Sequence, residues 1–364
     1  MKLFRCTNCG NALYFENTQC NRCGAALGYS PRSRSLLAIE PVGGVLWKDQ
    51  ASNNHYRLCG NYSQYQVCNW LVPAEESAPY CLSCRLNHMI PDLSISHNLN
   101  LWHTLEVDKR RLVYSLLRLG LPVYPKQANG DMGLAFDFLA DQAPVFNERE
   151  RVMTGHDNGL ITLNIAEADP AIRAATRDDM AEPYRTVLGH FRHESGHYYW
   201  DRLIRNSPWL DPFRQLFGNE ERDYNQALQQ HYSQPPVPGW QQNYVSHYAA
   251  SHPWEDWAES WAHYLHMVDT LETAHQFNLS LKLDDEGSLP SRTSVSFDPY
   301  YQTEFDPLIE HWMPLTLALN SLNRSMGHDD AYPFVLAPMV IEKLRFIHQV
   351  IDCTRQGIPA PDFH

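Results

Sequence analysis

The stretch GHFRHESGHYYWDRL, residues 189–203, places two histidines four positions apart, with a glutamate directly after the first. Its apolar residues recur at helical spacing, and we expect a helix over residues 183–205. Residues four apart lie on the same face of a helix, so His193 and His197 can both reach one metal ion. Glu194 lies about 100° round the helix, where it can hold a water on that metal without binding the metal itself. The stretch predicts a zinc site; the alternative is a buried helix with two satisfied histidines.

Such a site has the parts that peptide hydrolysis requires. Zinc acidifies a water molecule and polarises the scissile carbonyl, while Glu194 takes the proton and later passes it to the leaving amine. The two residues between Glu194 and His197 are small and uncharged, so the helix can pack closely under the metal. Residues 160–166, which precede the helix, read as an edge strand to which an extended substrate could add.

A catalytic zinc needs three protein ligands and one open position. Trp200 and Leu203 stand where a metzincin has a glycine and its third histidine, so that class is excluded. A second helix must supply the third ligand, and the best candidate is HYAASHPWEDWAESWAHYLH, residues 247–266. We expect Ser251 to cap this helix and Pro253 to lie in its first turn.

Two stripes run along this second helix. A polar stripe carries Glu255, Glu259 and His263 at spacings of four residues. Buried carboxylates need a reason, such as a metal and the groups that orient its ligands. We therefore expect Glu255 to be the third ligand and Glu259 to orient a ligand histidine. The reverse assignment and Asp256 stay open, and the alternative to a metal is a solvated acidic face. The apolar stripe consists of Trp254, Trp257, Ala258 and Trp261.

Residues 1–28 contain two C-x-x-C-G knuckles. Each knuckle aims two sulfurs and two backbone N–H groups at one ion, and the glycine lets the tight turn close. A unit this short cannot bury enough surface to fold alone, so a metal must supply the folding energy. The pattern predicts a zinc ribbon, with disulfides or free thiols as the alternatives. The predicted ligands are Cys6, Cys9, Cys20 and Cys23.

Residues 29–95 contain a second, irregular set of cysteines, of which only the last two form a knuckle. We expect a second four-cysteine zinc module, although His55 or His88 could replace one cysteine, and buried free thiols are the alternative. The predicted ligands are Cys59, Cys68, Cys81 and Cys84. Longer helical patterns follow, so residues 96–364 form the third predicted part. The expected fold class is α+β, mostly α, with zinc-ribbon modules before a domain that holds a small edge-strand sheet and the active-site helices.

Composition limits the partners of the chain. The net charge of −13 disfavours general nucleic-acid binding, although residues 1–118 carry a balance of +4 against −17 in the remainder. No run of eighteen apolar residues occurs, so we expect no membrane span. The N-terminus MKLFRCTNCG lacks the apolar core of a signal peptide. Because eight of the nine cysteines have metal-ligand spacing and thiolates require reducing conditions, we expect a cytoplasmic protein.

The segment Tyr248-Ala249-Ala250-Ser251-His252-Pro253-Trp254-Glu255, together with the histidine pair, resembles the gluzincin metallopeptidases. The likeness is to peptidases of the Mlc titration factor A type, related to the anthrax lethal factor catalytic domain. This resemblance implies that Glu255 is the third zinc ligand and that Tyr248 steadies the transition-state oxyanion, a sensible role for a phenol. For Tyr248 alone, a packed aromatic is the alternative. The two metal modules at the front depart from that pattern, so regulation and substrate choice do not transfer.

Nearly the whole chain also resembles bacterial zinc-binding metallopeptidases with an N-terminal zinc-ribbon domain, notably in CNWLVPA, YCLSCRLN and HPWEDWAESWAHYLH. We therefore expect a zinc endopeptidase or aminopeptidase that acts on peptides or proteins. It would hold one catalytic and two structural zinc ions, with ribbons that recognise a protein partner or guard the cleft. One alternative is a DNA-associated protease of the SprT-like kind, whose third ligand is a histidine. Another is a non-enzymatic, zinc-organised interaction protein in which His190, His252 or His263 closes the site.

Overall fold

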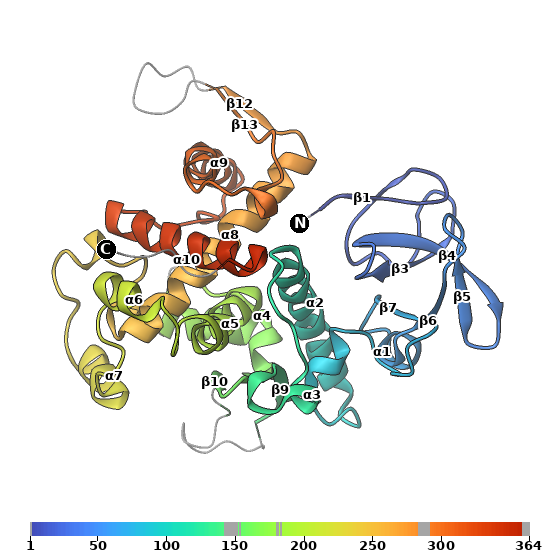
Figure 1. Ribbon diagram of the computed structural model, residues 1–364, viewed down its shortest axis with the longest axis horizontal. Helices are drawn as coiled ribbons and strands as arrows, with labels where there is room; N and C mark the ends of the chain where they lie inside the picture. The colour runs from blue at the N-terminus through green and yellow to red at the C-terminus, as the bar shows by residue number, and fades with distance from the viewer. Residues whose placement is uncertain are drawn as a thin grey trace. The chain divides into compact units, whose positions relative to one another are not determined.

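The computed structural model describes residues 2–141, 152, 154–179, 182, 184–282 and 292–358. The chain is a mixed α and β protein that is about 48% helical. It divides into two compact units, whose helices and strands are labelled in Figure 1. The first unit is Met1–Tyr114 with Val123–Thr176, and the second is Ser115–Pro122 with Arg177–His364. The prediction of a mixed fold is confirmed.

In the first unit, the two N-terminal knuckles close as tight turns. Gly10 and Gly24 follow the knuckles with φ of 72° and 74°. Their N–H groups each donate, at 2.9 Å, to the carbonyl of the first cysteine of their own knuckle, Cys6 or Cys20. A residue with a side chain rarely adopts this left-handed conformation, which explains why glycine ends each knuckle.

Two antiparallel sheets follow the order of the chain. A two-stranded sheet pairs β1 with β2, and a five-stranded sheet has the order β3-β4-β5-β6-β7. β3 crosses the predicted boundary at residue 28, so residues on both sides of that boundary share one sheet. The strands are β1 (Phe4–Arg5), β2 (Ala12–Leu13), β3 (Ala26–Ser30), β4 (Ser35–Gly43), β5 (Leu46–Asp49), β6 (His55–Leu58) and β7 (Leu71–Pro73).

An aromatic core joins the ribbon to its surroundings within this unit. The ring of Phe15 lies 5.0 Å from that of Tyr29 and 5.4 Å from that of Tyr114, and Tyr29 lies 4.7 Å from Trp70. Tyr114 belongs to α2 (Ser96–Arg118). All four rings are buried. The N-terminal module therefore gains apolar burial from its neighbours in addition to whatever a metal contributes.

A third sheet in the first unit has the order β10-β11-β9-β8. β10 and β11 form a hairpin that turns at Asn158 (φ 46°) and Gly159 (φ 83°). The prediction of an edge strand is wrong, because β11 pairs with β10 on one side and with β9 on the other. The strands are β8 (Asn87–Met89), β9 (Ala135–Leu139), β10 (Gly155–Asp157) and β11 (Leu160–Asn164).

The edge assignment failed for a physical reason. Ile161 and Leu163 are fully buried and alternate with Thr162, which indicates only that one face of the strand meets the core. Edge and interior strands share that pattern. β9, the second partner of β11, lies more than twenty residues earlier in the chain. Short helices complete the unit: α1 (Gly60–Tyr65), α3 (Lys126–Asn129) and α4 (Pro170–Asp179), the last ending beyond it.

The second unit is built on α8, which contacts α5, α6, α9 and α10. Figure 1 shows the ribbon of α10 crossing that of α8. Most residues of α8 are buried, as expected of a helix covered on several sides. None of the described helices has the length and apolar composition needed to span a membrane. The elements are α5 (Val187–Leu203), α6 (Leu210–Phe217), α7 (Tyr224–Ser233), α8 (Pro253–Gln276), β12 (Ser280–Lys282), β13 (Arg292–Ser294), α9 (Asp306–Ser325) and α10 (Pro338–Gln356).

The first turns of α5 and α8 differ from the predicted ones. α5 begins after Thr186, whose hydroxyl accepts a hydrogen bond from the N–H of Gly189 at 2.9 Å. The cap of α8 is His252 and not Ser251, because the imidazole Nδ1 accepts from the N–H of Trp254 at 3.1 Å. Pro253 lies in the first turn as predicted. Ser251 already has helical angles in a preceding short turn, so it lies one residue too early to cap.

Candidate metal centre

The two motif helices approach closely at Gly196. A β-carbon placed on Gly196 would lie 2.9 Å from the Cα of Ala258 on α8. The indole N–H of Trp257 donates to the carbonyl of Gly196 at 2.9 Å, and the indole N–H of Trp261 donates to the hydroxyl of Ser195 at 3.2 Å. Two tryptophans of α8 therefore form hydrogen bonds with the small residues that lie between the two histidines of α5.

We expect Gly196→Ala to lower stability by about 1–3 kcal/mol, because the added methyl group meets backbone that cannot move cheaply. Thermal unfolding and zinc content would measure the effect. Gly155→Ala is the control, since nothing lies within 4 Å of its added methyl group. Equal melting temperatures for the two variants would contradict the close approach.

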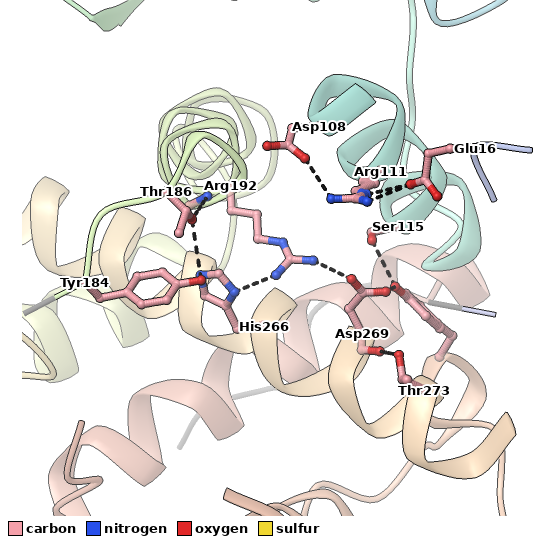
Figure 2. Close-up of polar contacts among 12 residues, drawn as sticks. Glu16, Asp108, Arg111, Ser115, Tyr184, Thr186, Arg192, His266, Asp269 and Thr273 are labelled. Carbon is pink, nitrogen blue, oxygen red and sulfur yellow. Dashed lines mark hydrogen bonds and ion pairs between the residues drawn. The ribbon is translucent and has the colours of Figure 1, made fainter. Parts of the chain in front are cut away.

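A buried polar network adds to the contact between α5 and α8. Nη1 of Arg192 lies 2.6 Å from Nδ1 of His266, and Nη2 donates to Oδ2 of Asp269 at 2.7 Å (Figure 2). The hydroxyl of Tyr300 lies 3.2 Å from the other carboxylate oxygen of Asp269. Because Arg192 directly precedes His193, this network fixes the rotation of α5 beside the first histidine.

His193, His197 and Glu255 bring three donor atoms together. Oε2 of Glu255 lies 2.9 Å from Nε2 of His193 and 3.4 Å from Nε2 of His197. One donor atom from each residue lies within 4.8 Å of the others. His197 and Glu255 are buried, and the side chain of His193 is 12% exposed. Nitrogen and oxygen ligands about 2.0–2.2 Å from zinc in a tetrahedron lie roughly 3.3–3.6 Å apart. The donor set fits a zinc ion; its 3.4 Å separation lies in this range, and its 2.9 Å separation is shorter.

The groups behind these donors hold them in position. Nδ1 of His193 lies 2.7 Å from Oε1 of Glu259, and the hydroxyl of Ser246 donates to the other oxygen of Glu259 at 2.6 Å. Burial alone would lower the pKa of His193, but hydrogen bonds to Glu255 and Glu259 outweigh it and raise that pKa well above its ordinary value. A carboxylate on Nδ1 would leave Nε2 to bind a metal ion, the usual arrangement of a ligand histidine.

Glu194 and Tyr248 lie beside the three donors. Glu194 is buried, and burial raises the pKa of its carboxyl, partly offset by the two histidines. The ring of Tyr248 lies 5.9 Å from that of His193. Burial raises the pKa of the Tyr248 phenol well above its ordinary value, so the phenol stays protonated and can donate.

The other residues considered as metal ligands do not join the three donors. Asp256 faces away from the histidine pair and binds the ammonium group of Lys343 at 2.6 Å. His252 caps α8, and Nδ1 of His263 lies 2.6 Å from the hydroxyl of Tyr332. Among the described residues, this metal-binding group contains three donors and no fourth. The third donor is a carboxylate, unlike the histidine expected of a SprT-like protease.

Each predicted cysteine set comes together as a group of four. The sulfurs of Cys6 and Cys23 lie 3.8 Å apart, and those of Cys68 and Cys81 lie 3.7 Å apart. Thiolates bound to tetrahedral zinc are about 3.8 Å apart, so both sets fit zinc. His88 binds Asp137 and does not join the second set, nor does His55. The complete sets are Cys6, Cys9, Cys20 and Cys23, and Cys59, Cys68, Cys81 and Cys84.

Three residues that bind Glu255, Glu259 or the neighbouring Asp256 were not anticipated from the sequence. Ser246 binds Glu259, Lys343 binds Asp256, and Tyr224 donates to Glu255 at 2.6 Å. Tyr224 and Lys343 lie 31 and 87 residues from their partners. No periodicity or spacing links positions so far apart, so only the tertiary structure reveals these contacts.

Comparisons with known proteins agree with this geometry. A zinc-ribbon domain family matches residues 3–95. Uncharacterized proteins of Mycobacterium bovis and Mycobacterium tuberculosis are each 43% identical to the chain over 364 residues, covering 100% of this chain and 97% of the relative. No solved structure matches significantly. A second family, described as "Putative zinc-binding metallo-peptidase", matches residues 98–350, which include both motif helices, and the chain belongs to that family.

Proposed function

We propose that the chain is a zinc-dependent peptidase of the gluzincin type, which hydrolyses peptide bonds at the centre formed by His193, His197 and Glu255. The observation that carries the proposal is a set of three converging donors with a buried carboxylic acid, Glu194, on the next position of the same helix. Three protein donors leave one tetrahedral corner for water or substrate, which is typical of catalytic rather than structural zinc. The family match supports the same class of chemistry.

A zinc ion held by these residues would acidify water and polarise a peptide carbonyl. The carboxylate of Glu194 would accept the proton of the attacking water and then donate it to the leaving nitrogen. Its raised pKa brings proton gain and loss closer to neutral pH. The neutral phenol of Tyr248 would donate a hydrogen bond to the oxygen that becomes negative in the transition state. Glu259 would hold His193 in the tautomer that presents Nε2.

We propose that the two cysteine modules hold structural zinc and bind a protein partner or the substrate. Eight thiolate ligands require a reducing environment, which favours a cytoplasmic protein that acts on peptides or proteins.

A cleavage assay with metal counting tests the proposal. The zinc-loaded full chain is incubated with a mixed peptide library, and new termini are identified by mass spectrometry. We expect cleavage that 1,10-phenanthroline stops, three zinc ions per chain, and two zinc ions with no cleavage for His197→Ala. An unchanged library alongside three bound zinc ions would instead indicate a non-enzymatic zinc protein.

A further inference from the structure

Tyr224 binds the carboxylate oxygen of Glu255 that does not face the histidines. Its hydroxyl donates to Oε1 of Glu255 at 2.6 Å, while Oε2 faces both imidazoles. Glu255 is 1% exposed, so water does not compete freely for Oε1. With Oε1 engaged, the carboxylate is oriented to offer a single oxygen to a metal.

The position of Tyr224 is built by the residues around it. Asp223 caps α7 by accepting from the N–H of Gln226 at 2.8 Å, which makes Tyr224 the first residue of that helix. The carbonyl of Arg222, two residues before Tyr224, lies 3.1 Å from Nε2 of His252. Hydrogen bonds therefore hold the backbone before and after Tyr224, independently of the Tyr224 side chain.

The ring of Tyr224 is held by the start of α8. It meets the ring of His252 edge-on at 5.3 Å and that of Trp254 edge-on at 5.9 Å. Trp254 in turn lies over the ring of His197 at 3.8 Å. The same residues that begin α8 and cover a metal-binding histidine thus fix the direction of the Tyr224 hydroxyl.

The geometry points to Tyr224 as a positioning residue for the metal centre: its hydroxyl orients Glu255 as a one-oxygen ligand, as Glu259 orients His193. This inference rests on the proposed zinc site and not on hydrolysis. It gives the two partly buried tyrosines near Glu255 separate roles. Tyr224 acts on a metal ligand, whereas Tyr248 is proposed to act on substrate.

Metal affinity of full-length variants tests this role. Zinc retained per chain is measured while free zinc is buffered to decreasing levels, and His193→Ala defines the ions held by the cysteine sets. Loss of a residue that orients a metal ligand costs roughly 10–100-fold in affinity, and we expect Tyr224→Phe to weaken the third zinc by that factor. Tyr248→Phe should lower the rate of cleavage and leave zinc affinity unchanged. Tyr232 is an exposed tyrosine of α7, the helix of Tyr224, and Tyr232→Phe should change neither the zinc affinity nor the rate of cleavage.

A second measurement separates positioning from general damage. Cobalt replaces zinc, and the visible absorption of the third ion is obtained by subtracting the spectrum of His193→Ala. We expect Tyr224→Phe to alter this spectrum while the melting temperature and the ions in the cysteine sets are retained. An unchanged affinity and an unchanged spectrum would overturn the inference even if cleavage fell. Equal metal content in wild type and His193→Ala would overturn the zinc site itself, and the inference with it.

Discussion

Glu194→Gln is expected to abolish measurable hydrolysis and leave all three zinc ions in place. Glutamine has the size of glutamate but cannot accept a proton, and loss of a general acid–base group typically costs roughly 10²–10⁴-fold in rate. Glu194 is not among the three converging donors, so the metal should stay. The measurement is the cleavage rate of a peptide taken from the library, together with zinc per chain.

Glu221→Gln is the matched control, because the same change is made on a side chain that is 73% exposed. Its rate should equal that of the wild type. If Glu194→Gln kept more than a tenth of the wild-type rate, another group would have to move the proton, and the proposed role of Glu194 would be wrong. If it lost the third zinc ion, the residue would instead support the metal site.

The metal centre was the part of the molecule most open to prediction from sequence. His193 and His197 are four apart on one helix, so their convergence follows from helix geometry alone. Glu255 and Glu259 are likewise four apart, and the structure brings the first to both histidines and the second behind His193. Each cysteine set could be grouped because its members are close in sequence and have few other uses in such short segments.

Features that depend on distant pairing could not be predicted. The alternation of residues 160–164 indicates one buried face, but whether β11 lies at an edge depends on β9, which arrives from another part of the chain. Capping of α8 by His252 in place of Ser251 depends on where a preceding short turn ends, within one residue. Tyr224 lies on a helix whose start the sequence indicates only approximately, and nothing in its spacing indicates that its hydroxyl meets Glu255.

Lys343 is another such residue, and its replacement is expected to have the second large effect. Its ammonium group lies 2.6 Å from the carboxylate of Asp256 and 2.6 Å from the backbone carbonyl of Asn243. The side chains of Lys343 and Asp256 are almost fully buried. Lys343→Met keeps most of the length of the side chain and removes the charge. Leaving a buried partner without its counter-ion costs about 3–5 kcal/mol, and we expect a loss of that size at pH 8, measured by denaturant unfolding.

The loss should depend on pH in a defined direction. Burial raises the pKa of Asp256 from 3.8 to about 7 even beside Lys343, and the pKa rises further without the ammonium group. A carboxyl whose folded pKa is raised contributes stability at low pH, and that contribution is lost as the pH rises through the folded pKa. The difference between Lys343→Met and wild type should therefore be small at pH 6 and widen above pH 7.

The double variant Lys343→Met with Asp256→Leu separates the pair from the packing around it. Replacing both members of a buried ion pair with apolar groups is often nearly neutral, so the double variant should recover most of the stability at pH 8. Recovery would show that the stability lost in Lys343→Met comes from the Asp256 carboxylate, which is left without its counter-ion. Equal losses in the single and double variants would instead assign it to the bond between Lys343 and Asn243. Because Asn243 lies three residues before Ser246, that result would make the segment supporting Glu259 the weak point of the metal centre.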